Sequence, residues 1–216
     1  MLVFEISNRK IFIESPVDAK DHAKTIDDVI ERYSSNDKIP FWIEVWPSAI
    51  ALAEFILESD EFTGKKVLDL GCGLGLTSVA LGLKKAIVTA TDYEMIALQY
   101  ARRNYIRNIG NEENARFIYL DWRHPNISEK FDFVIGADII YERNLFPDLI
   151  RLLEIAMRDD SVCYLSDPNR IFSSEFFNML SEQNFKYNIV LEKEIDYRDS
   201  RAIVSIYRIK KSVPAL

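Results

Sequence analysis

The chain has 216 residues, 48% of them hydrophobic and 28% charged, which is the composition of one soluble globular domain and excludes a disordered chain. Its formal net charge of −7 and pI near 5.0, without a long run of Lys and Arg, make a nucleic acid an unexpected partner. Two cysteines, two distant histidines and the lack of any run of 18 apolar residues argue against a metal site and a membrane span, so we expect a cytoplasmic protein with buried, reduced thiols.

The first 38 residues predict an extension that precedes the main domain. Short apolar segments at 2–6 and 10–14 flank a turn at 7–9 and predict a hairpin. Apolar residues at helical spacing over 26–33 then predict an amphipathic helix. We expect the hairpin and the helix to cover a cofactor or substrate site, and we expect the main domain to occupy residues 39–216.

An aromatic-rich segment, 39–47, leads into the main domain. After it, apolar residues at helical spacing from Ala49 to Leu57 predict a helix, and Pro47 suits the first turn of that helix. Core packing alone would explain Trp42. The spacing leaves both a structural and a functional explanation open for Trp46.

The stretch 67–75 is the feature around which the rest of the chain is organised. Apolar residues in 67–70 predict a buried strand, and residues 76–81 predict a short helix. Glycine reaches positive φ without a Cβ clash and lets a ligand approach the backbone closely, although a turn of this kind can also be only a tight connection. The glycines between the strand and the helix are Gly71, Gly73 and Gly75.

This loop does not fit a phosphate-rich ligand. A dinucleotide fingerprint places its third glycine where this chain has Leu76, and a P-loop would end in Gly-Lys followed by Ser or Thr. Asp69, directly before the loop, would repel a pyrophosphate. The next predicted strand, 86–91, leads to Asp92, about 20 residues beyond the first glycine, where an acid accepts hydrogen bonds from two ribose hydroxyls. We therefore expect a nucleoside ligand without phosphates.

Helices and strands alternate along the rest of the chain. Helices are predicted over 95–105, 145–156 and around 176–180, and strands over 116–119, 131–137, 161–165, 185–194 and 201–209. Asn144 suits the N-cap of the second of these helices, and a charged loop at 195–200 joins the last two strands into a hairpin. This order predicts an α/β fold with a doubly wound sheet. Ligands of such sheets bind beyond the carboxyl ends of the strands where the strand order reverses, which is where Asp138 is expected.

The motif D-x-G-x-G-x-G at 69–75, followed by Asp92, resembles the cofactor motif of the seven-β-strand S-adenosylmethionine-dependent methyltransferases. The resemblance extends over residues 40–208 and implies a seven-stranded, mostly parallel sheet with an antiparallel C-terminal hairpin, and S-adenosylmethionine as the cofactor. It implies that Asp121 accepts a hydrogen bond from the adenine amine and that Trp122 covers the ring, although a loop acid or a helix cap is the alternative for Asp121. The other cofactor contacts that we assign are Asp69, Gly71, Gly73, Gly75 and Ala137.

A second motif narrows this resemblance. The pattern P-x-W-x-x-x-W-P-x-x-x-x-L-A at 40–53 is similar to the segment that precedes the cofactor loop in family-16 methyltransferases. That branch contains many protein-lysine methyltransferases. The resemblance implies that Glu44 and Trp46 lie against the methionine part of the cofactor.

Two motifs after the later strands also resemble this branch. From D-x-x-Y at 138–141 we expect that Asp138 orients the acceptor nitrogen and that Tyr141 shapes the channel to it. The motif D-P-x-R at 167–170 borders the substrate mouth in that branch, although a polar turn would explain it equally well.

The expected activity is N-methylation of a lysine side chain in a protein. One alternative is a methyltransferase that acts on a small-molecule amine or hydroxyl compound, and another is a non-catalytic binding module of the same fold. A nicotinamide-dependent dehydrogenase is disfavoured by Leu76. A wide mouth between residues 1–40 and 195–200 would fit a protein acceptor, whereas a closed mouth would fit a metabolite.

Overall fold

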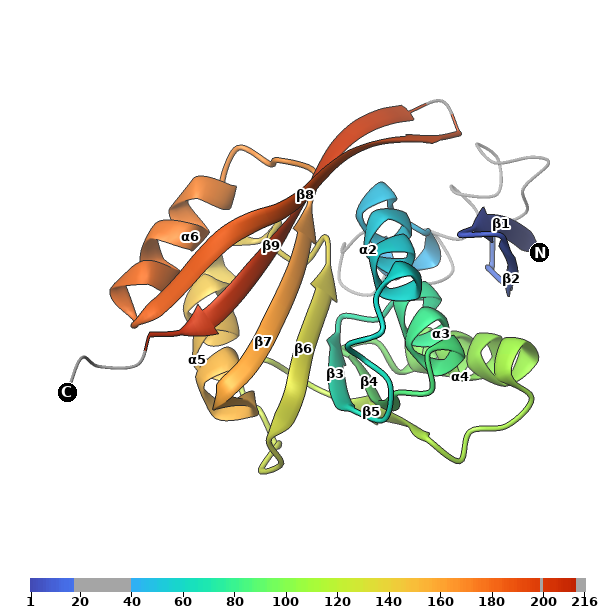
Figure 1. Cartoon of the computed structure of the whole chain (residues 1–216), viewed down its shortest axis with the longest axis horizontal. Helices are drawn as coiled ribbons and strands as arrows, with labels where there is room; N and C mark the ends of the chain where they lie inside the picture. Colours follow the sequence, from blue (N-terminus) through green and yellow to red (C-terminus); the bar gives the residue numbers. More distant parts are fainter. Residues whose placement is uncertain (18–39, 199, 213–216) are drawn as a thin grey trace.

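A seven-stranded sheet forms the centre of the chain in this computed structural model, which describes residues 1–17, 40–198 and 200–212 (Figure 1). Its strands are β3 (Lys66–Leu70), β4 (Ile87–Asp92), β5 (Ala115–Tyr119), β6 (Phe131–Ala137), β7 (Met157–Asp167), β8 (Phe185–Tyr197) and β9 (Ser200–Lys211). They lie in the order β5-β4-β3-β6-β7-β9-β8, parallel from β5 to β7, with β9 antiparallel to both of its neighbours. This arrangement confirms the predicted doubly wound sheet and its C-terminal hairpin.

Helices cover both faces of this sheet. The α-helices among the described residues are α2 (Pro47–Glu58), α3 (Leu76–Leu83), α4 (Met95–Ile109), α5 (Phe146–Ala156) and α6 (Ser173–Glu182). Helices α2, α3 and α4 lie on one face, and α5 and α6 lie on the other (Figure 1). Alternate residues of β3 point to opposite faces, so Val67 packs with the first set of helices while Leu68 and Leu70 pack with the second. None of these helices is both long and apolar enough to cross a membrane.

The middle of the sheet positions the site. The strand order reverses between β3 and β6, which are parallel neighbours. The carboxyl ends of these two strands therefore open at the same edge of the sheet as that of β4, which pairs in parallel with β3 on its other side. A crevice at such a reversal is the usual ligand site of a doubly wound sheet.

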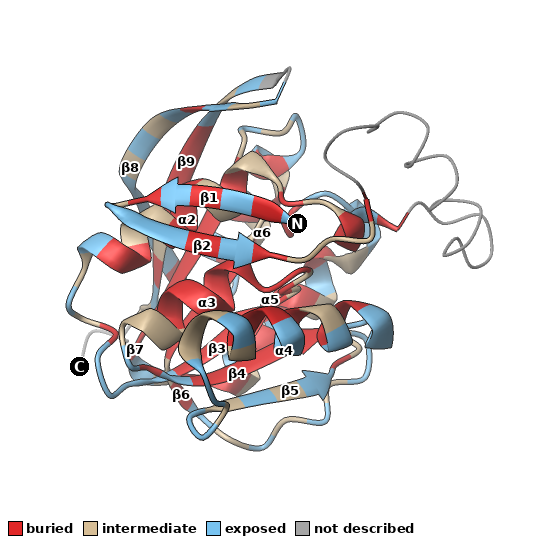
Figure 2. Cartoon of the chain, turned by 90° about the vertical axis from the view of Figure 1, so that its right-hand side faces the viewer, coloured by how far each residue is buried: buried red, intermediate tan, exposed pale blue. Residues whose placement is uncertain are grey.

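The predicted N-terminal hairpin is confirmed as β1 (Leu2–Ile6) and β2 (Arg9–Ile13). It lies across the helices of one face, with buried residues alternating with exposed ones along β1 (Figure 2). Its inward side chains belong to the same apolar cluster as residues of α2, α3 and α4. The backbone is tied to α4 as well, because the Glu14 N–H donates to Asn104 Oδ1 at 2.7 Å.

None of the residues of the hairpin lines the cavity at the carboxyl ends of the central strands. Its predicted role as a cover of a cofactor or substrate site therefore stays a prediction. The apolar residues of β1 and β2 pair with the outer side of the helices. The helix predicted over 26–33 lies outside the described residues, and the proposed boundary between 1–38 and 39–216 stays a prediction.

Several predicted boundaries differ from the structure. Helix α5 begins at Phe146 after a 3-10 turn at Arg143–Leu145, and its N-cap is Leu145 rather than Asn144. Proline is tolerated in the first turn of a helix, where its missing N–H has no partner to lose, so Pro147 marks this start better than the asparagine does. Strand β7 is longer than 161–165, since it begins directly after α5.

The C-terminal hairpin is also longer than predicted. Strand β8 continues to Tyr197 and β9 begins at Ser200, so most of the predicted loop 195–200 is paired strand. Its charged residues face each other across the hairpin, where Arg201 pairs with both Glu194 and Asp196. Opposite charges on neighbouring strands stabilise the pairing, whereas in the sequence the same residues indicate a polar loop.

Gly75→Ala is expected to lower the free energy of unfolding by about 2 to 4 kcal/mol, the sum of left-handed strain and overpacking. Gly75 precedes α3 with φ +83, and a Cβ there would lie 2.9 Å from the Cα of Ala101 on α4. Gly110→Ala is the matched control, because Gly110 has φ +92 but open space around it. The control should lose only about 1 kcal/mol. Equal losses for the two variants in urea unfolding would contradict this account of how α3 packs on α4.

Candidate active site

A cavity of about 510 Å³ opens at the carboxyl ends of β3, β4 and β6. Its volume lies in the range of small-molecule sites, roughly 300 to 1,000 Å³. Of the twelve residues that the sequence predicts for the site, every one except Asp69 lines this cavity. The eleven are Glu44, Trp46, Gly71, Gly73, Gly75, Asp92, Asp121, Trp122, Ala137, Asp138 and Tyr141. The fold therefore brings together segments that are up to about a hundred residues apart in the chain.

The glycine loop presents bare backbone to the cavity. Its glycines have positive φ, +62 at Gly71, +51 at Gly73 and +83 at Gly75. A hydrogen bond from the Cys72 N–H to the Thr91 carbonyl oxygen, at 2.9 Å, ties the loop to the end of β4. Because no side chain projects from these positions, a ligand can lie directly against the main chain.

Asp69 lies at the end of β3 directly before the glycine loop and does not line the cavity. It is 1% exposed, and its Oδ2 accepts hydrogen bonds from Thr77 Oγ1 at 2.8 Å and Ser78 Oγ at 2.6 Å. Its Oδ1 is buried without a partner among the described residues. Burial raises the pKa of this carboxyl to about 6. Asp69 thus joins β3 to the start of α3, and its predicted contact with the ligand stays a prediction.

Asp69→Asn is expected to make stability depend less on pH. The pKa of Asp69 rises from 3.8 to about 6 on folding, so the folded protein holds a proton that the unfolded chain has already released. The stability that this neutral form contributes is fully present below about pH 4 and is lost as pH rises through 6. Relative to wild type, the variant should therefore gain up to about 3 kcal/mol between pH 4 and pH 8. Urea unfolding at both pH values measures this gain, and a difference that does not change with pH would contradict it.

Asp92 ends β4 with its carboxylate at the cavity wall. It is 8% exposed, and its two oxygens accept hydrogen bonds from the N–H groups of Gly73 and Glu94, each at 2.9 Å. A carboxylate offers about four lone-pair positions, so about two stay available for the hydroxyls of a ligand. Burial raises the pKa of this group to about 6. This geometry fits the two hydroxyls of a ribose.

Asp121 is less available than predicted. Its carboxylate accepts hydrogen bonds from the guanidinium of Arg123 at 2.9 and 2.8 Å and from the Arg123 N–H at 3.0 Å. The Arg123 guanidinium also holds the pKa of Asp121 below its ordinary value. This agrees in part with the loop-acid alternative. The neighbouring Trp122 is half-buried against the second apolar cluster and forms a wall of the cavity beside Gly71.

Asp138 follows β6 in the left-handed conformation, with φ +56. Its N–H donates to the Ser166 carbonyl oxygen at the end of β7, at 2.8 Å. The carboxylate is not free: Arg170 donates from Nε to Oδ1 at 2.7 Å and from Nη2 to Oδ2 at 2.9 Å. Partial burial and the nearby carboxylates raise the pKa of Tyr141 to about 12, so its hydroxyl stays protonated at neutral pH.

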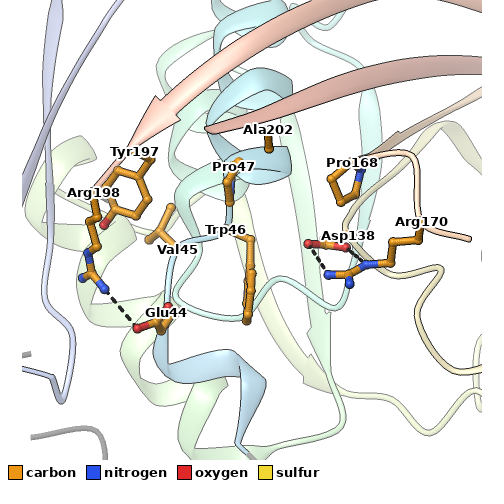
Figure 3. Close-up of a pocket in the computed structure, with 10 residues that line it drawn as sticks. All are labelled: Glu44, Val45, Trp46, Pro47, Asp138, Pro168, Arg170, Tyr197, Arg198 and Ala202. Atoms are coloured by element: carbon orange, nitrogen blue, oxygen red, sulfur yellow. Dashed lines mark hydrogen bonds and ion pairs between the residues drawn. The ribbon is translucent and has the colours of Figure 1, made fainter. Parts of the chain in front are cut away.

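A second cavity, of about 480 Å³, shares part of its lining with the first, and Figure 3 draws the residues that line it. Glu44, Val45, Trp46 and Asp138 line both cavities. Figure 3 shows the Trp46 ring between two ion pairs, Glu44 with Arg198 at 3.0 Å and Asp138 with Arg170 at 2.7 Å. Asp138 therefore lies where a molecule in one cavity can meet a molecule in the other.

Sequence reasoning missed part of this second cavity. Tyr197, Arg198 and Ala202 come from the tip of the β8–β9 hairpin, where the sequence predicts a loop at the substrate mouth but names no site residue. Arg170 had a signal, the D-P-x-R motif, but not an assigned partner. Within that motif, Asp167 Oδ2 accepts the Arg170 N–H at 3.1 Å and fixes the turn.

A sheet in this strand order, with a glycine loop after its first strand and an acid at the end of the next, defines the Rossmann-like S-adenosylmethionine-dependent methyltransferases. The fold is similar to the crystal structure of magnesium protoporphyrin IX methyltransferase from Synechocystis PCC 6803 with bound S-adenosylmethionine. The TM-score is 0.62 at 16% sequence identity, over 88% of this chain and 92% of that one. Residues 35–183 match the family described as lysine methyltransferase, and the chain belongs to that family.

The sequence relatives of this chain include protein methyltransferases. The chain is 32% identical over 176 residues to Protein N-lysine methyltransferase METTL21A of Danio rerio, and the aligned region covers 78% of this chain and 77% of the relative. It is 30% identical over 162 residues to Histidine protein methyltransferase 1 homolog of Dictyostelium discoideum, and the aligned region covers 71% of this chain and 50% of that relative. The match to the second protein thus spans about half of its length.

Proposed function

We propose that this chain transfers a methyl group from S-adenosylmethionine to the side-chain nitrogen of a lysine in a protein. The observation that carries this proposal is the position of Asp138, which lines both cavities. One cavity has the glycine loop and the ribose-type acid of a nucleoside site. The other is bordered by the hairpin tip and the loop after β7, and it gives an acceptor access to the same carboxylate.

The first cavity fits the cofactor in chemical character. Asp92 would hold the ribose hydroxyls, the glycine loop would lie along the methionine tail, and Asp121 with Trp122 would border adenine. Glu44, Trp46 and Ala137 would complete the methionine end. The bound cofactor supplies an electrophilic methyl: the lone pair of the acceptor nitrogen forms the new N–C bond as the C–S bond breaks and leaves its electron pair on sulfur. The chain's own residues therefore need only to bind, orient and desolvate the reactants.

The acceptor nitrogen has to be neutral before it can attack. A lysine ammonium, with a reference pKa of about 10.4, has no lone pair. Asp138 would aim the nitrogen by accepting one of its N–H groups, and the rings of Tyr141 and Trp46 would favour its neutral form by excluding water. After transfer, these rings would also attract the methylated ammonium.

Exposed apolar side chains around Asp138 support a protein acceptor over a metabolite. Phe41 is 45% exposed and Tyr141 is 41% exposed, with ring centroids 5.4 Å apart. In the loop that carries Arg170, Ile171 is 89% exposed and Phe172 is 40% exposed. Clustered apolar groups at a surface are typical of sites that another protein covers. A small metabolite would leave these side chains in water.

A labelling experiment tests the acceptor class. The pure protein is incubated with methyl-labelled S-adenosylmethionine and a lysate that lacks its own copy, and the labelled material is hydrolysed to amino acids. We expect label in a protein band, recovered as methyl-lysine. Label in the small-molecule fraction would instead show a metabolite methyltransferase, and methylhistidine would show a different acceptor residue. Cofactor binding without any transfer would identify a non-catalytic binding protein.

We place this reaction in the cytoplasm, with no nucleic-acid partner, as the sequence predicts. Cys72 and Cys163 are buried free thiols in the structure, which is compatible with a reducing compartment. Fractionation of cells that express a tagged chain measures the location. Recovery of the chain from an oxidising compartment would contradict it.

A further inference from the structure

We propose that Arg170 is a positioning residue that balances the charge of Asp138 and so allows the acceptor amine to lose its proton. The inference rests on the proposed function, because it concerns the amine that Asp138 would aim. Two requirements oppose each other in that site, because the acceptor amine has to be held in place and also has to lose its proton. A lone carboxylate orients an amine well but also favours its protonated form, which cannot attack.

The geometry places a fixed cation against the aiming carboxylate. Arg170 engages both oxygens of Asp138 through two hydrogen bonds, at 2.7 and 2.9 Å. The Asp138 side chain is 4% exposed and that of Arg170 is 36% exposed, so the pair lies at the boundary between the buried site and the second cavity. Such bidentate pairs have a defined orientation.

The turn that carries Arg170 is anchored from the core. Asp167 is fully buried, and its Oδ2 accepts hydrogen bonds from the Arg170 N–H at 3.1 Å and from Ser173 Oγ at 2.6 Å. Pro168 lies between these positions and restricts the backbone. The hydrogen bonds of Asp167 therefore hold the turn rigid and keep the Arg170 guanidinium in a fixed position, which a charge-balancing role requires.

The other charges near Asp138 make this cation necessary. Asp92, Glu94 and Glu142 line the first cavity, where the cation of Arg123 is matched by Asp121, and Asp167 lies beneath the turn. Glu44 is already matched by Arg198, while Tyr141 and Tyr197 are uncharged at neutral pH because burial raises the pKa of each hydroxyl. Without Arg170, the uncompensated charges facing the amine would be carboxylates alone.

An amine that approaches the Asp138–Arg170 pair from the cavities meets an ion pair with nearly no net charge. It can still donate an N–H to a carboxylate oxygen, but its protonated form gains little because the guanidinium repels it. The ammonium can thus release its proton to water, and the nitrogen keeps the lone pair that forms the N–C bond. Loss of Arg170 should hold the amine in its charged form until the pH is about one to two units higher.

The test compares Arg170→Gln, which removes the charge, with Arg170→Lys, which keeps it. The rate of label transfer into the acceptor band is measured from pH 6.5 to pH 10. For Arg170→Gln we expect the acid limb of the rate profile to move up by about one to two pH units, with a loss of about ten- to a hundredfold at pH 7.5 that recovers near pH 10. Arg170→Lys should keep the wild-type limb. An unchanged profile, or an equal loss at every pH, would overturn the proposal.

A binding measurement keeps this test separate from the proposed function. With S-adenosylhomocysteine present, each protein is titrated with n-butylamine, which carries the same amine as a lysine side chain. At pH 7.5, Arg170→Gln should bind this ammonium about tenfold more tightly than wild type, and the difference should vanish near pH 10. Equal affinities at pH 7.5 would overturn the charge-balancing role even if the wild type transferred no label. Conversely, a wild type without transfer but with this binding difference would refute only the proposed function.

Discussion

Asp138→Ala is expected to reduce methyl transfer by at least about a hundredfold while leaving cofactor affinity within about threefold of wild type. Its carboxylate lies between the two cavities and would aim the acceptor nitrogen at the methyl group. The cofactor's sugar and base would be held elsewhere, by Asp92 and the loop after β5. The measurement is the transfer of labelled methyl into the acceptor band, with calorimetry of S-adenosylmethionine binding on the same preparation.

Asp138→Asn is the matched control. Asp138 has φ +56, a conformation that asparagine tolerates and alanine resists, so the amide variant separates loss of charge from backbone strain. Both variants should transfer methyl at least about a hundredfold more slowly than wild type, and the asparagine variant should keep the stability of wild type more closely. Normal turnover by either variant would show that Asp138 does not aim the acceptor.

Asp92→Ala is expected to raise the dissociation constant for S-adenosylmethionine by about 5- to 150-fold, which corresponds to about 1 to 3 kcal/mol. The carboxylate is buried and holds the Gly73 N–H at 2.9 Å, so its loss removes the proposed ribose contacts and loosens the glycine loop. Titration calorimetry measures the change.

Asp121→Ala should have a smaller effect on cofactor affinity than Asp92→Ala. Arg123 already occupies most of the Asp121 carboxylate through three hydrogen bonds, so less of its hydrogen-bonding capacity is left for adenine. Unchanged affinity in Asp92→Ala, or a larger loss in Asp121→Ala, would contradict the proposed orientation of the nucleoside.

Much of the fold follows from local pattern. From β3 to β6 the buried strands follow short apolar runs, and the glycine loop, Asp92 and Asp138 mark where β3, β4 and β6 end. Asp92 could be placed at the site because the carboxyl ends of parallel strands share one edge. The same reasoning misplaced the tip of the C-terminal hairpin, where Glu194, Asp196 and Arg201 pair across the strands, because the sequence does not show which charges face each other.

The side-chain partners within the site were harder to predict. The burial of Asp69 beneath α3 could have been predicted, because alternate residues of a strand point to the same face and Asp69 therefore shares a face with Val67. That face of the sheet meets α3, where Thr77 and Ser78 donate hydrogen bonds to the Asp69 carboxylate. No comparable rule pairs Asp138 with Arg170, 32 positions apart. Their contact depends on β6 and β7 being neighbours and on the turn after β7, so it exists only in the assembled sheet.

The most direct test is a crystal structure of the chain with S-adenosylhomocysteine. The account predicts the ribose hydroxyls within about 3 Å of the Asp92 carboxylate oxygens, at hydrogen-bond distance, with the sulfur directed toward Asp138 and the second cavity. A nucleoside bound with its sugar away from Asp92, or a first cavity that stays empty at saturating ligand, would contradict the account.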